Sequence, residues 1–467
     1  MGIAGSQPRN TPELTPMISE NIPTWTRHLP KDWHISRIKF CATKIGSGIT
    51  PRGGSETYKT EGVALLRSQN VYDDGLRLED VAYIDAATDE EMRRTRLKSD
   101  DVLLNITGAS IGRTCIVPAS VLPANVNQHV CIIRPALGMS PDFLSYVLKS
   151  RFIRDQILSG ENGASREGLN YDQVGNLCLP KPSLSEQKKI AAFLDVETVK
   201  SDALKAKYTR LIELLGEKRL ALISHVVTGR SLHDVPTRLS GIDWMGLIPA
   251  HWEVSQVRHL STLITKGTTP TSLGKDFVVE GIRFIKVESI SHSQTILHDK
   301  CAAIDEETDA LLARSRVRAN DLLVAIAGAI GRVAIALKED VPANTNQAVA
   351  IVRPIVEKVK PDWLGYAFAS SGSQRYLDDA AVQSAQANLS LQNLGRLPIA
   401  VPPLVEQERL LEALRRALAQ LDEGKALLQK ALALVMDRRI ALITAAVTGQ
   451  IDVETYNKKL GPAKVAV

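Results

Sequence analysis

Residues 123–128 read Pro-Ala-Asn-Val-Asn-Gln, and residues 342–347 repeat them, 219 positions later, as Pro-Ala-Asn-Thr-Asn-Gln. Residues 101–108, DVLLNITG, return in the same way at residues 321–328 as DLLVAIAG. A repeat of roughly 20–50 residues indicates a solenoid, whereas a much longer period indicates a whole domain with its own core. The chain of 467 residues is therefore predicted to contain two tandem copies of one domain.

Each copy begins with a part that is rich in predicted strands. Short runs of β-branched residues, such as Cys131–Ile133 and Val349–Val352, are bounded by proline, glycine and asparagine, which commonly end strands. A few short helices are expected between the strands, for example at residues 142–150 and 362–370. The two strand-rich parts are expected to cover residues 22–184 and 248–404.

Each strand-rich part leads into a stretch that predicts one long helix. Residues 185–228 and 405–449 contain no proline, and each stretch follows a proline-rich stop. A helix of about 43 residues extends roughly 64 Å. The predicted fold is therefore α+β, with two tandem strand-rich domains that are each followed by a long α-helix. The remaining parts are predicted to be a disordered N-terminal extension (residues 1–21), a polar linker (229–247) and a C-terminal tail (450–467).

Apolar residues along the two long helices follow a heptad-like spacing, which indicates that the helices pair along a seam. Because the linker is short, the second helix is expected to run back along the first. This predicts an antiparallel coiled coil with pseudo-two-fold symmetry and one domain at each end. The alternative is that each helix packs only on its own domain. The predicted seam residues are Ile190, Leu194, Leu204, Tyr208, Leu211, Leu215, Leu222, Leu410, Leu414, Leu428, Val435 and Leu442.

Composition and charge restrict the function without specifying it. Hydrophobic residues make up 44% and charged residues 23%, as in ordinary globular proteins. Lys and Arg outnumber Asp and Glu by 57 to 52, and the net charge of +5 permits a nucleic-acid partner without demonstrating one. The five cysteines include no CxxC pair, which favours reduced thiols and a cytoplasmic location. We expect neither a signal peptide nor a membrane span, since no apolar stretch has the required length.

The motifs of common enzyme classes are not found in the sequence. There is no Walker A loop, no HExxH pair and no paired CxxC, so neither a catalytic residue nor a metal site is predicted. The glycine-containing stretches at residues 108–112 and 328–331 favour tight turns, with a phosphate-binding loop as the alternative. A nuclease-like Glu-x-Lys at residues 186–188 is disfavoured, because the second copy has Glu408 where the first has Lys188.

Several short motifs that recur in the same order resemble one known family. The second long helix opens with Pro-Pro-Leu-Val-Glu-Gln at residues 402–407, and the first with Pro-Ser-Leu-Ser-Glu-Gln at residues 182–187. From about residue 22 to residue 449, the chain resembles the specificity (S) subunit of type I restriction–modification systems. The other shared motifs are Pro-x-x-Trp (ending at Trp33 and Trp252), Gly-x-Thr-Pro (residues 48–51 and 267–270) and Val-Thr-Gly (227–229 and 447–449).

The resemblance implies two target-recognition domains that each read one half of a split double-stranded DNA target. It also implies that the long helices act as a spacer and as the docking surface for two modification (methyltransferase) subunits, with restriction subunits bound through them. S-adenosylmethionine, ATP and Mg²⁺ are then expected in the partner subunits and not in this chain, which would itself be non-catalytic.

The two copies differ most beside the first glycine turn, where readers of two unlike half-sites are expected to differ. Arg67 aligns with Lys286, and such cations suit a phosphate or a guanine edge. Amide side chains suit adenine, and a carboxylate can accept a hydrogen bond from cytosine. Ordinary drift between duplicated surfaces is the alternative. The predicted DNA-binding residues are Thr50, Arg52, Lys59, Arg67, Gln69, Asn70, Arg113, Thr269, Lys275, Lys286, Glu288, Ser289 and Arg332.

Other classes of function account for part of this pattern. A non-enzymatic tandem scaffold, or a DNA-binding protein without restriction partners, would also lack catalytic motifs. A scaffold would not explain basic and amide residues beside glycine turns in both copies. A stand-alone methyltransferase needs an Asn-Pro-Pro-aromatic loop or an equivalent, which the sequence does not contain.

Overall fold

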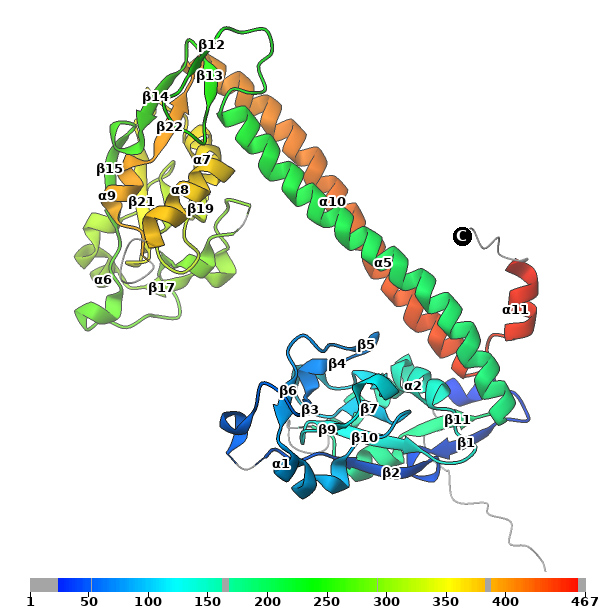
Figure 1. The fold of residues 1–467 in the computed structure, drawn as a ribbon. Helices are drawn as coiled ribbons and strands as arrows, with labels where there is room; N and C mark the ends of the chain where they lie inside the picture. Colours follow the sequence, from blue (N-terminus) through cyan, green and yellow to red (C-terminus); the bar gives the residue numbers. More distant parts are fainter. Residues whose placement is uncertain (1–23, 52, 162–167, 292, 383–387, 461–467) are drawn as a thin grey trace, which may run out of the picture. The chain divides into compact units, whose positions relative to one another are not determined.

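The computed structural model of the chain describes residues 24–51, 53–161, 168–291, 293–382 and 388–460 (Figure 1). Its contacts divide the chain into two compact units. Unit 1 combines the residues up to 207 with those from 431 onward, and unit 2 is the continuous stretch of residues 208–430. Both long helices, α5 (Leu184–Val227) and α10 (Leu404–Val447), therefore contribute one part to each unit.

The strand-rich part of unit 1, called domain 1 below, contains a four-stranded antiparallel sheet in the order β2-β10-β7-β8. Val102 and Leu104 of β7 face one buried cluster, whereas Leu103 faces another. This explains the uninterrupted apolar run, because both faces of the strand are covered. A second sheet, β6-β3-β9, supplies one of the covering layers. The strands are β1 (His34–Arg37), β2 (Ala42–Ser47), β3 (Val63–Leu66), β4 (Val71–Tyr72), β5 (Gly75–Leu76), β6 (Ala82–Ile84), β7 (Val102–Asn105), β8 (Thr114–Ile116), β9 (Ala124–Val126), β10 (Val130–Pro135) and β11 (Cys178–Lys181).

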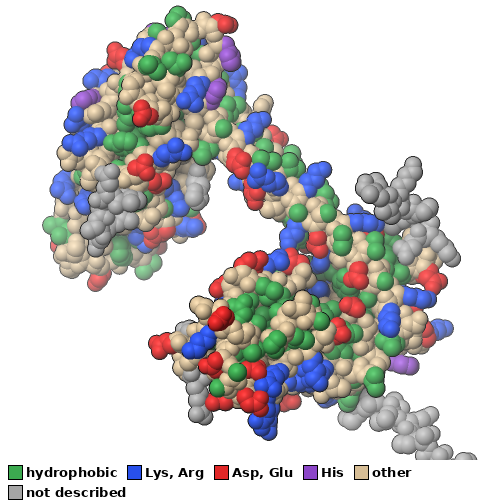
Figure 2. Space-filling view, viewed as in Figure 1, with side chains coloured by type: hydrophobic (Ala, Val, Ile, Leu, Met, Phe, Trp, Pro, Cys, Tyr) green, Lys and Arg blue, Asp and Glu red, His purple; other side chains and the backbone are tan. Residues whose placement is uncertain are grey.

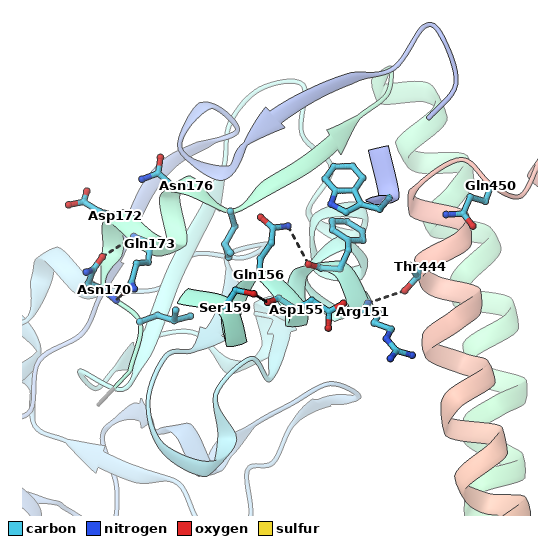
Figure 3. A pocket seen from close by; sticks show the side chains of 14 residues that line it. Arg151, Asp155, Gln156, Ser159, Asn170, Asp172, Gln173, Asn176, Thr444 and Gln450 are labelled. Atoms are coloured by element: carbon cyan, nitrogen blue, oxygen red, sulfur yellow. Dashed lines mark hydrogen bonds between the residues drawn. The ribbon is translucent and has the colours of Figure 1, made fainter. Parts of the chain in front are cut away.

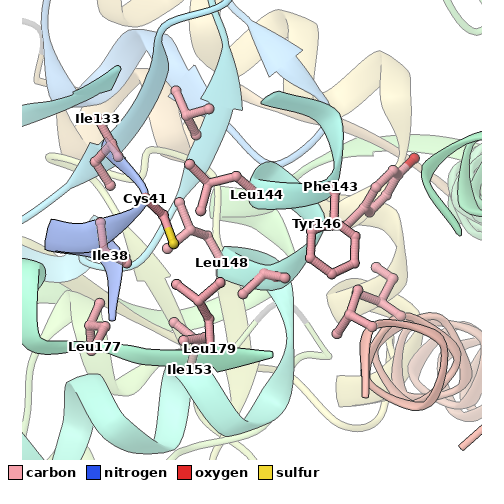
Figure 4. Packing of buried hydrophobic residues seen from close by; sticks show 14 of the residues in the cluster. Ile38, Cys41, Ile133, Phe143, Leu144, Tyr146, Leu148, Ile153, Leu177 and Leu179 are labelled. Atoms are coloured by element: carbon pink, nitrogen blue, oxygen red, sulfur yellow. The ribbon is translucent and has the colours of Figure 1, made fainter. Parts of the chain in front are cut away.

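Short helices cover the other face of the four-stranded sheet. Helix α2 begins with a proline behind Ser140, whose hydroxyl accepts a hydrogen bond from Phe143 N at 3.5 Å. Phe143, Leu144 and Leu148 of this helix lie in one buried cluster with Ile133 of β10 (Figure 4). The helices of unit 1 outside the long pair are α1 (Ala86–Glu91), α2 (Pro141–Lys149), α3 (Arg151–Glu161), α4 (Tyr171–Asn176) and α11 (Val453–Leu460).

Unit 2 repeats this order of elements, and its strand-rich part is called domain 2. Its sheets have the orders β15-β21-β18-β19 and β17-β16-β20, which match those of domain 1 strand for strand. The elements are β12 (Thr237–Leu239), β13 (Leu247–Pro249), β14 (Glu253–Gln256), β15 (Ser261–Lys266), β16 (Ile282–Ile285), β17 (Ala302–Ile304), β18 (Leu322–Ala325), β19 (Val333–Ile335), β20 (Ala343–Thr345), β21 (Val349–Pro354), β22 (Pro398–Val401), α6 (Glu306–Leu311), α7 (Pro361–Ala369), α8 (Ser371–Val382) and α9 (Leu391–Arg396).

Each unit also holds an arginine–aspartate pair whose carboxylate is almost completely buried. Arg134 of β10 donates to the two carboxylate oxygens of Asp101 at 2.6 and 2.7 Å. Arg353 of β21 binds Asp321 in the same way, at 2.7 Å for both bonds. The carboxylates are 0% and 1% exposed, so each depends on its arginine for charge compensation.

The glutamine of each Glu-Gln motif anchors the start of a long helix on its own domain. The side chain of Gln187 donates to Gly138 O and Pro182 O, both at 3.0 Å, and accepts from Ser140 N at 2.8 Å. Gln407 makes the matching three bonds at the start of α10. Both side chains are fully buried, so the motif has a structural role in both copies.

The two long helices pack against each other in both units, in opposite directions. In unit 1, Ile190 and Leu194 near the start of α5 share a buried cluster with Ile443 near the end of α10. In unit 2, Leu410 near the start of α10 shares a cluster with Ile223 near the end of α5. The predicted antiparallel pairing of the helices is therefore confirmed (Figure 1).

The glycine after each long helix docks on a repeated Pro-x-x-Trp motif. In unit 1, Gly449 has φ +70°, and a Cβ atom there would lie 2.5 Å from Cδ of Pro30 and 3.4 Å from the ring of Trp33. In unit 2, Gly229 takes the same place against Pro249. Helix α10 thus ends on domain 1 and helix α5 on domain 2, and only glycine fits at either junction.

The predicted seam is one residue out of phase in the middle of α5. The structure leaves Leu204 and Leu211 exposed and turns Ile212 inward instead. An α-helix drifts by about 20° per heptad from a strict 3.5-residue period, and adjacent apolar residues at 211 and 212 hide the drift in the sequence. Of the other predicted positions, Ile190, Leu194, Leu410 and Leu414 are buried, and Tyr208, Leu215, Leu222, Leu428, Val435 and Leu442 are half-buried.

Two predicted connecting segments contain regular structure. Within the predicted polar linker, β12 pairs with β13, and Met245 is buried in the core of unit 2. Arg238 holds this hairpin by donating to Trp252 O at 2.6 Å. In the predicted tail, α11 packs on unit 1 through Tyr456, whose ring lies 5.1 Å from that of Phe193. Both segments are polar on average, but single apolar side chains, Met245 and Tyr456, pack them against their units.

Candidate nucleic-acid interface

Several loops of domain 1 meet at one end of its sheets. Strands β3 and β9 run parallel, so their last residues are neighbours, and β2 and β7 both end opposite the start of β10. We call these loops the loop end of domain 1: residues 48–51, 67–70, 106–113, 127–129 and 168–171. The loop end of domain 2 consists of the equivalent residues 267–270, 286–289, 326–332, 346–348 and 388–391.

The glycine of the Gly-x-Thr-Pro motif brings two of these loops into contact. Gly48 N donates to Asn127 O at 3.2 Å, and Gly267 N donates to Asn346 O at 3.1 Å. A Cβ atom on either glycine would overlap the backbone of the facing loop. The motif therefore holds each loop end closed, and it does so in the same way in both domains.

The same turn carries a threonine whose hydroxyl is bonded to an exposed glutamine. Thr50 Oγ1 donates to Gln128 Oε1, and Thr269 Oγ1 donates to Gln347 Oε1. Both threonines belong to the predicted set, whereas sequence reasoning missed both glutamines. The repeated motif could have indicated them, because Asn-x-Asn-Gln occurs in both copies and a glutamine side chain is not required for packing the core.

Domain 1 extends this pair through a histidine. His129 Nε2 lies 3.1 Å from Gln128 Nε2, and His129 Nδ1 lies 2.7 Å from Thr107 Oγ1. With the glutamine amide as donor, the imidazole accepts at Nε2 and donates at Nδ1. The loop end of domain 1 therefore carries a continuous chain of hydrogen-bonding side chains from Thr50 to Thr107.

The predicted residues Arg67 and Gln69 both bind Asp80. Arg67 Nη2 donates to Asp80 O at 2.9 Å and lies 3.4 Å from Asp80 Oδ2, and its guanidinium stacks 5.7 Å from the ring of Tyr58. The side-chain amide of Gln69 donates to the same carboxylate. The structure thus brings these two predicted residues together at the surface, where Asp80 orients both.

The equivalent residues of domain 2 pair with each other. Lys286 Nζ lies 2.8 Å from Glu288 Oε1 and 6.0 Å from the ring centre of Phe277. The hydrogen bond from Lys286 lowers the pKa of Glu288, so this carboxyl is ionised at neutral pH. The two loop ends therefore present different charge patterns on one framework.

The predicted base contacts of Asn70 and Ser289 are wrong. Asn70 is buried, and its amide accepts from Arg67 N at 2.9 Å and donates to Arg77 O at 2.9 Å. Ser289 is buried too, accepts from Lys286 N at 3.2 Å and donates to Lys300 O at 2.9 Å. Each caps the turn that carries the basic residue and has no group left for a base.

Arg113 and Arg332 occupy equivalent places at the two loop ends with different neighbours. The guanidinium of Arg113 stacks 4.6 Å from the ring centre of Tyr72, which Arg77 also approaches, at 5.2 Å. Arg332 Nη1 donates to Ile290 O at 3.2 Å. Domain 1 thus holds two arginines around one tyrosine, an arrangement stabilised by cation–π attraction.

The remaining predicted residues lie outside the loop ends. Lys59 is exposed, and its backbone N–H donates to Tyr83 O at 2.9 Å beside β6. Lys275 pairs with Glu307 at 2.6 Å, and this hydrogen bond raises the pKa of the lysine. Arg52 falls outside the described residues.

Surface charges of both signs surround these sites. Figure 2 shows Lys and Arg side chains interspersed with Asp and Glu over the visible face of each unit. Many basic residues of the structure are held in ion pairs, including Arg67 and Lys286 at the loop ends. On this face charges of both signs alternate, and the basic residues Arg67 and Lys286 of the loop ends are positioned by acidic partners.

A cavity of about 850 Å³ in unit 1 borders the loop end of domain 1 through Leu169 and Asn170. It opens between α3, α4 and the end of α10, and Arg151 N donates to Thr444 Oγ1 across it at 3.0 Å (Figure 3). Three of its polar side chains form structural bonds. Asn170 and Gln173 cap α4, and Gln156 accepts from Cys178 N at 2.8 Å.

Comparison with known proteins connects this geometry to a family. The model of the type I restriction modification DNA specificity domain matches twice, at residues 31–213 and 249–431. The chain belongs to the family of type I restriction–modification specificity subunits. The two matches cover the two predicted recognition domains and run on into both long helices.

Individual specificity subunits are similar over most of their length. The EcoBI specificity subunit of Escherichia coli is 28% identical over 337 residues, which cover 70% of each chain. The putative MjaX specificity subunit of Methanocaldococcus jannaschii is 22% identical over 91% of this chain and 95% of its own. A solved chain from a study of complex assembly and conformational transition of the type I R-M system has the same fold, with a TM-score of 0.59, 18% identity and coverage of 91% and 99%.

The described residues of this specificity subunit contain neither a metal-binding cluster nor a membrane-spanning helix. Among them, no three His, Cys, Asp or Glu side chains are grouped so that they would hold a metal ion. No helix in the described part of the chain has the length and apolar character needed to cross a membrane.

Proposed function

We propose that each loop end of this DNA sequence-recognition subunit reads one half of a split double-stranded target. The observation that carries the proposal is one backbone framework with two sets of side chains. Domain 1 presents Arg67 and Gln69, where domain 2 presents Lys286 and Glu288. A reader of two unlike half-sites needs a common framework to approach the duplex and different side chains to contact the bases.

The chemistry of these side chains suits groups in the major groove. The Arg67 side chain is 21% exposed while Asp80 holds its Nη2, so the guanidinium offers a positioned cation to a guanine edge or a phosphate. Gln69 suits adenine. Glu288 is ionised at neutral pH and suits the amino group of cytosine.

The long helices are proposed to dock two modification subunits, with restriction subunits bound through them. Exposed apolar side chains support this role, because a monomeric helix pair in water has no use for them. Figure 2 shows hydrophobic side chains between charged ones along the helices. The exposed apolar residues of the two helices include Val196, Val199, Leu204, Leu434 and Met436 in unit 1, and Leu211, Leu214, Leu220 and Leu427 in unit 2.

The chain itself is proposed to be non-catalytic and to act in the cytoplasm. Methyl transfer from S-adenosylmethionine and the ATP- and Mg²⁺-dependent steps would belong to the partner subunits. In support, the side chains of the loop ends form hydrogen bonds and ion pairs of the kind used in recognition. The purified chain should then neither methylate nor cut DNA, and methyl transfer by a homogeneous preparation would refute this assignment.

The experiment that tests the proposed function is methylation-aware sequencing of DNA from cells that express the chain with its modification subunits. We expect a motif with two different short blocks around an unread spacer. Exchange of residues 41–96 for those of another specificity subunit should change one block and leave the other intact. A contiguous motif, or a change in both blocks, contradicts independent reading by two domains.

A second measurement distinguishes the chain from a tandem scaffold. Retention of the assembled complex on duplex DNA should fall steeply as the salt concentration rises, since phosphate contacts release counterions. A scaffold would show no retention at any salt concentration.

A further inference from the structure

At two equivalent positions the loop ends have the same backbone, but domain 1 has polar side chains where domain 2 has apolar ones. Domain 1 has Thr107 and His129, here called the threonine–histidine pair. Domain 2 has Ala327 and Ala348 at the equivalent positions, here called the alanine pair. All four side chains are half-buried, so each pair is partly accessible from outside.

The backbone around the two pairs is the same. The carbonyl of His129 accepts from Ile106 N at 3.1 Å, and that of Ala348 accepts from Ile326 N at 2.8 Å. The backbone N–H of each residue donates to the preceding asparagine side chain, at 3.2 Å in both domains. The two copies therefore differ here in their side chains and not in the path of the chain.

The side chain next to each pair is the same exposed glutamine. In domain 1, the imidazole lies 3.1 Å from the amide nitrogen of Gln128 and engages one of its donors. In domain 2, methyl groups stand in place of the imidazole and the hydroxyl, and Gln347 is held by Thr269 through its oxygen. Beside this glutamine in the sequence, domain 2 therefore has the methyl group of Ala348 where domain 1 has an imidazole.

We propose that these pairs determine sequence specificity, and that the alanine pair with Gln347 reads an A·T base pair. A glutamine amide matches the edge of adenine, and small apolar side chains contact the 5-methyl group of thymine. The threonine–histidine pair removes the apolar surface and offers hydrogen-bonding groups instead, so domain 1 reads its own position without a methyl contact. The inference rests on the proposed function, because it assigns residues within the reading surface.

Exchange of the two pairs tests the inference in the assembled complex. The variant Ala327→Thr/Ala348→His should lose the preference for one A·T pair in the half-site of domain 2 and leave the other half-site unchanged. The reciprocal variant Thr107→Ala/His129→Ala should alter one position in the half-site of domain 1 only. In each variant the untouched half-site is the internal control for folding and assembly. An unchanged motif in both variants overturns the inference.

A chemical probe isolates the methyl contact without changing the protein. Duplexes that carry the methylated motif are made with deoxyuridine in place of each thymine in turn, which removes only the 5-methyl group. The unaltered complex should bind one such duplex, modified in the half-site of domain 2, about fourfold more weakly, the factor for one buried methyl group. The Ala327→Thr/Ala348→His variant should bind it no more weakly than the thymine duplex.

The outcomes separate this inference from the proposed function. A wild-type complex that methylates no split motif would refute the proposed function itself. A split motif with no methyl-sensitive thymine in the half-site of domain 2 would overturn the inference alone. Where a variant fails to assemble, the deoxyuridine series on the unaltered complex decides.

Discussion

In the interiors of the two domains, a change in one side chain is matched by a change in its neighbour. At the loop ends, side chains differ without such matching changes. In domain 1, Trp25 stacks on Phe152 with ring centres 4.5 Å apart. In domain 2, Trp244 lies against Gly372, where even a Cβ atom would overlap the indole ring. The contrast teaches that changes in the core must fit their neighbours, because interiors are close-packed. At the loop ends, Arg67 and Lys286 have different partners on the same backbone, and nothing in the core had to change with them.

Each unit contains its own arginine–aspartate pair with a buried carboxylate, and breaking this pair is expected to have the largest effect. Arg134→Ala should lower the free energy of unfolding of unit 1, and Arg353→Ala that of unit 2, by about 3–5 kcal/mol, because each leaves a buried carboxylate uncompensated. Hydrogen exchange of the four-stranded sheets reports each unit separately. Arg77→Ala, which removes an exposed pair with Asp74, is the control and should cost less than about 1 kcal/mol. Equal loss of protection in both units would contradict their independence.

Substitution of the glycine after each long helix tests whether the two domain–helix junctions are equivalent. Gly449→Ala should destabilise unit 1 by about 2–3 kcal/mol, since positive φ costs an L-residue about 1–2 kcal/mol and the methyl group also meets Pro30. Gly229→Ala should do the same to unit 2. Thermal unfolding with exchange as the local readout measures both.

A glycine inside α5 supplies the matched control for these two variants. Gly216 has open space around its Cβ position and lies mid-helix, so Gly216→Ala should stabilise the protein by about 0.8–1 kcal/mol. Destabilisation by this variant as well would show that the helix-end effect does not come from the junction.

Substitution of the basic residue at each loop end sharpens the comparison of function. Arg67→Ala and Lys286→Ala should each weaken DNA binding by the assembled complex by about 1–2 kcal/mol. A base contact relaxes the methylated motif at one position of one half-site, whereas a phosphate contact weakens all sequences alike and lowers the salt slope by about one. Binding titrations at several salt concentrations and motif sequencing distinguish these cases. Full affinity with an unchanged motif would remove both residues from the interface.

The smallest expected effect concerns two ion pairs between the long helices. Arg219 lies 3.4 Å from Asp422 in unit 2, and Arg439 lies 3.3 Å from Asp202 in unit 1, at equivalent positions. Asp422→Asn and Asp202→Asn should each cost about 0.5 kcal/mol, because partly exposed pairs are screened by solvent. Chemical denaturation should give equal losses, and a clear inequality would show that the two halves of the helix pair are not equivalent.

Most of the fold could be predicted from the internal repeat, because motifs that recur in the same order indicate that both copies have the same arrangement of elements. It predicted two strand-rich domains and two long antiparallel helices, which the structure confirms. The phase of the seam at Leu211 was not predictable, since apolar residues at adjacent positions leave both faces of the helix open. Likewise, β12 and α11 depend on contacts with distant residues that no local pattern reveals.

The candidate site was less predictable than the fold. Residue type favoured Asn70 as a base contact, but the amide is used up by Arg77, seven residues away around a turn. Gln128 was missed because its partner Thr50 lies 78 residues earlier in the chain. Sequence pattern thus predicted a region for DNA contacts, whereas the surroundings of single side chains required knowing which loops meet.

The division of the chain into units imposes an order on its synthesis. Unit 2 is a continuous stretch, but the core of unit 1 includes Ile443, Val447 and Val453. A ribosome makes domain 1 first, yet the residues that complete its core emerge last, after the whole of unit 2. The domain nearest the start of the chain is therefore the last to be finished, and its Pro30–Trp33 surface stays uncovered until Gly449 arrives. A message cut short after unit 2 would yield a chain whose second reader has all of its core residues and whose first reader is left open to proteases and chaperones.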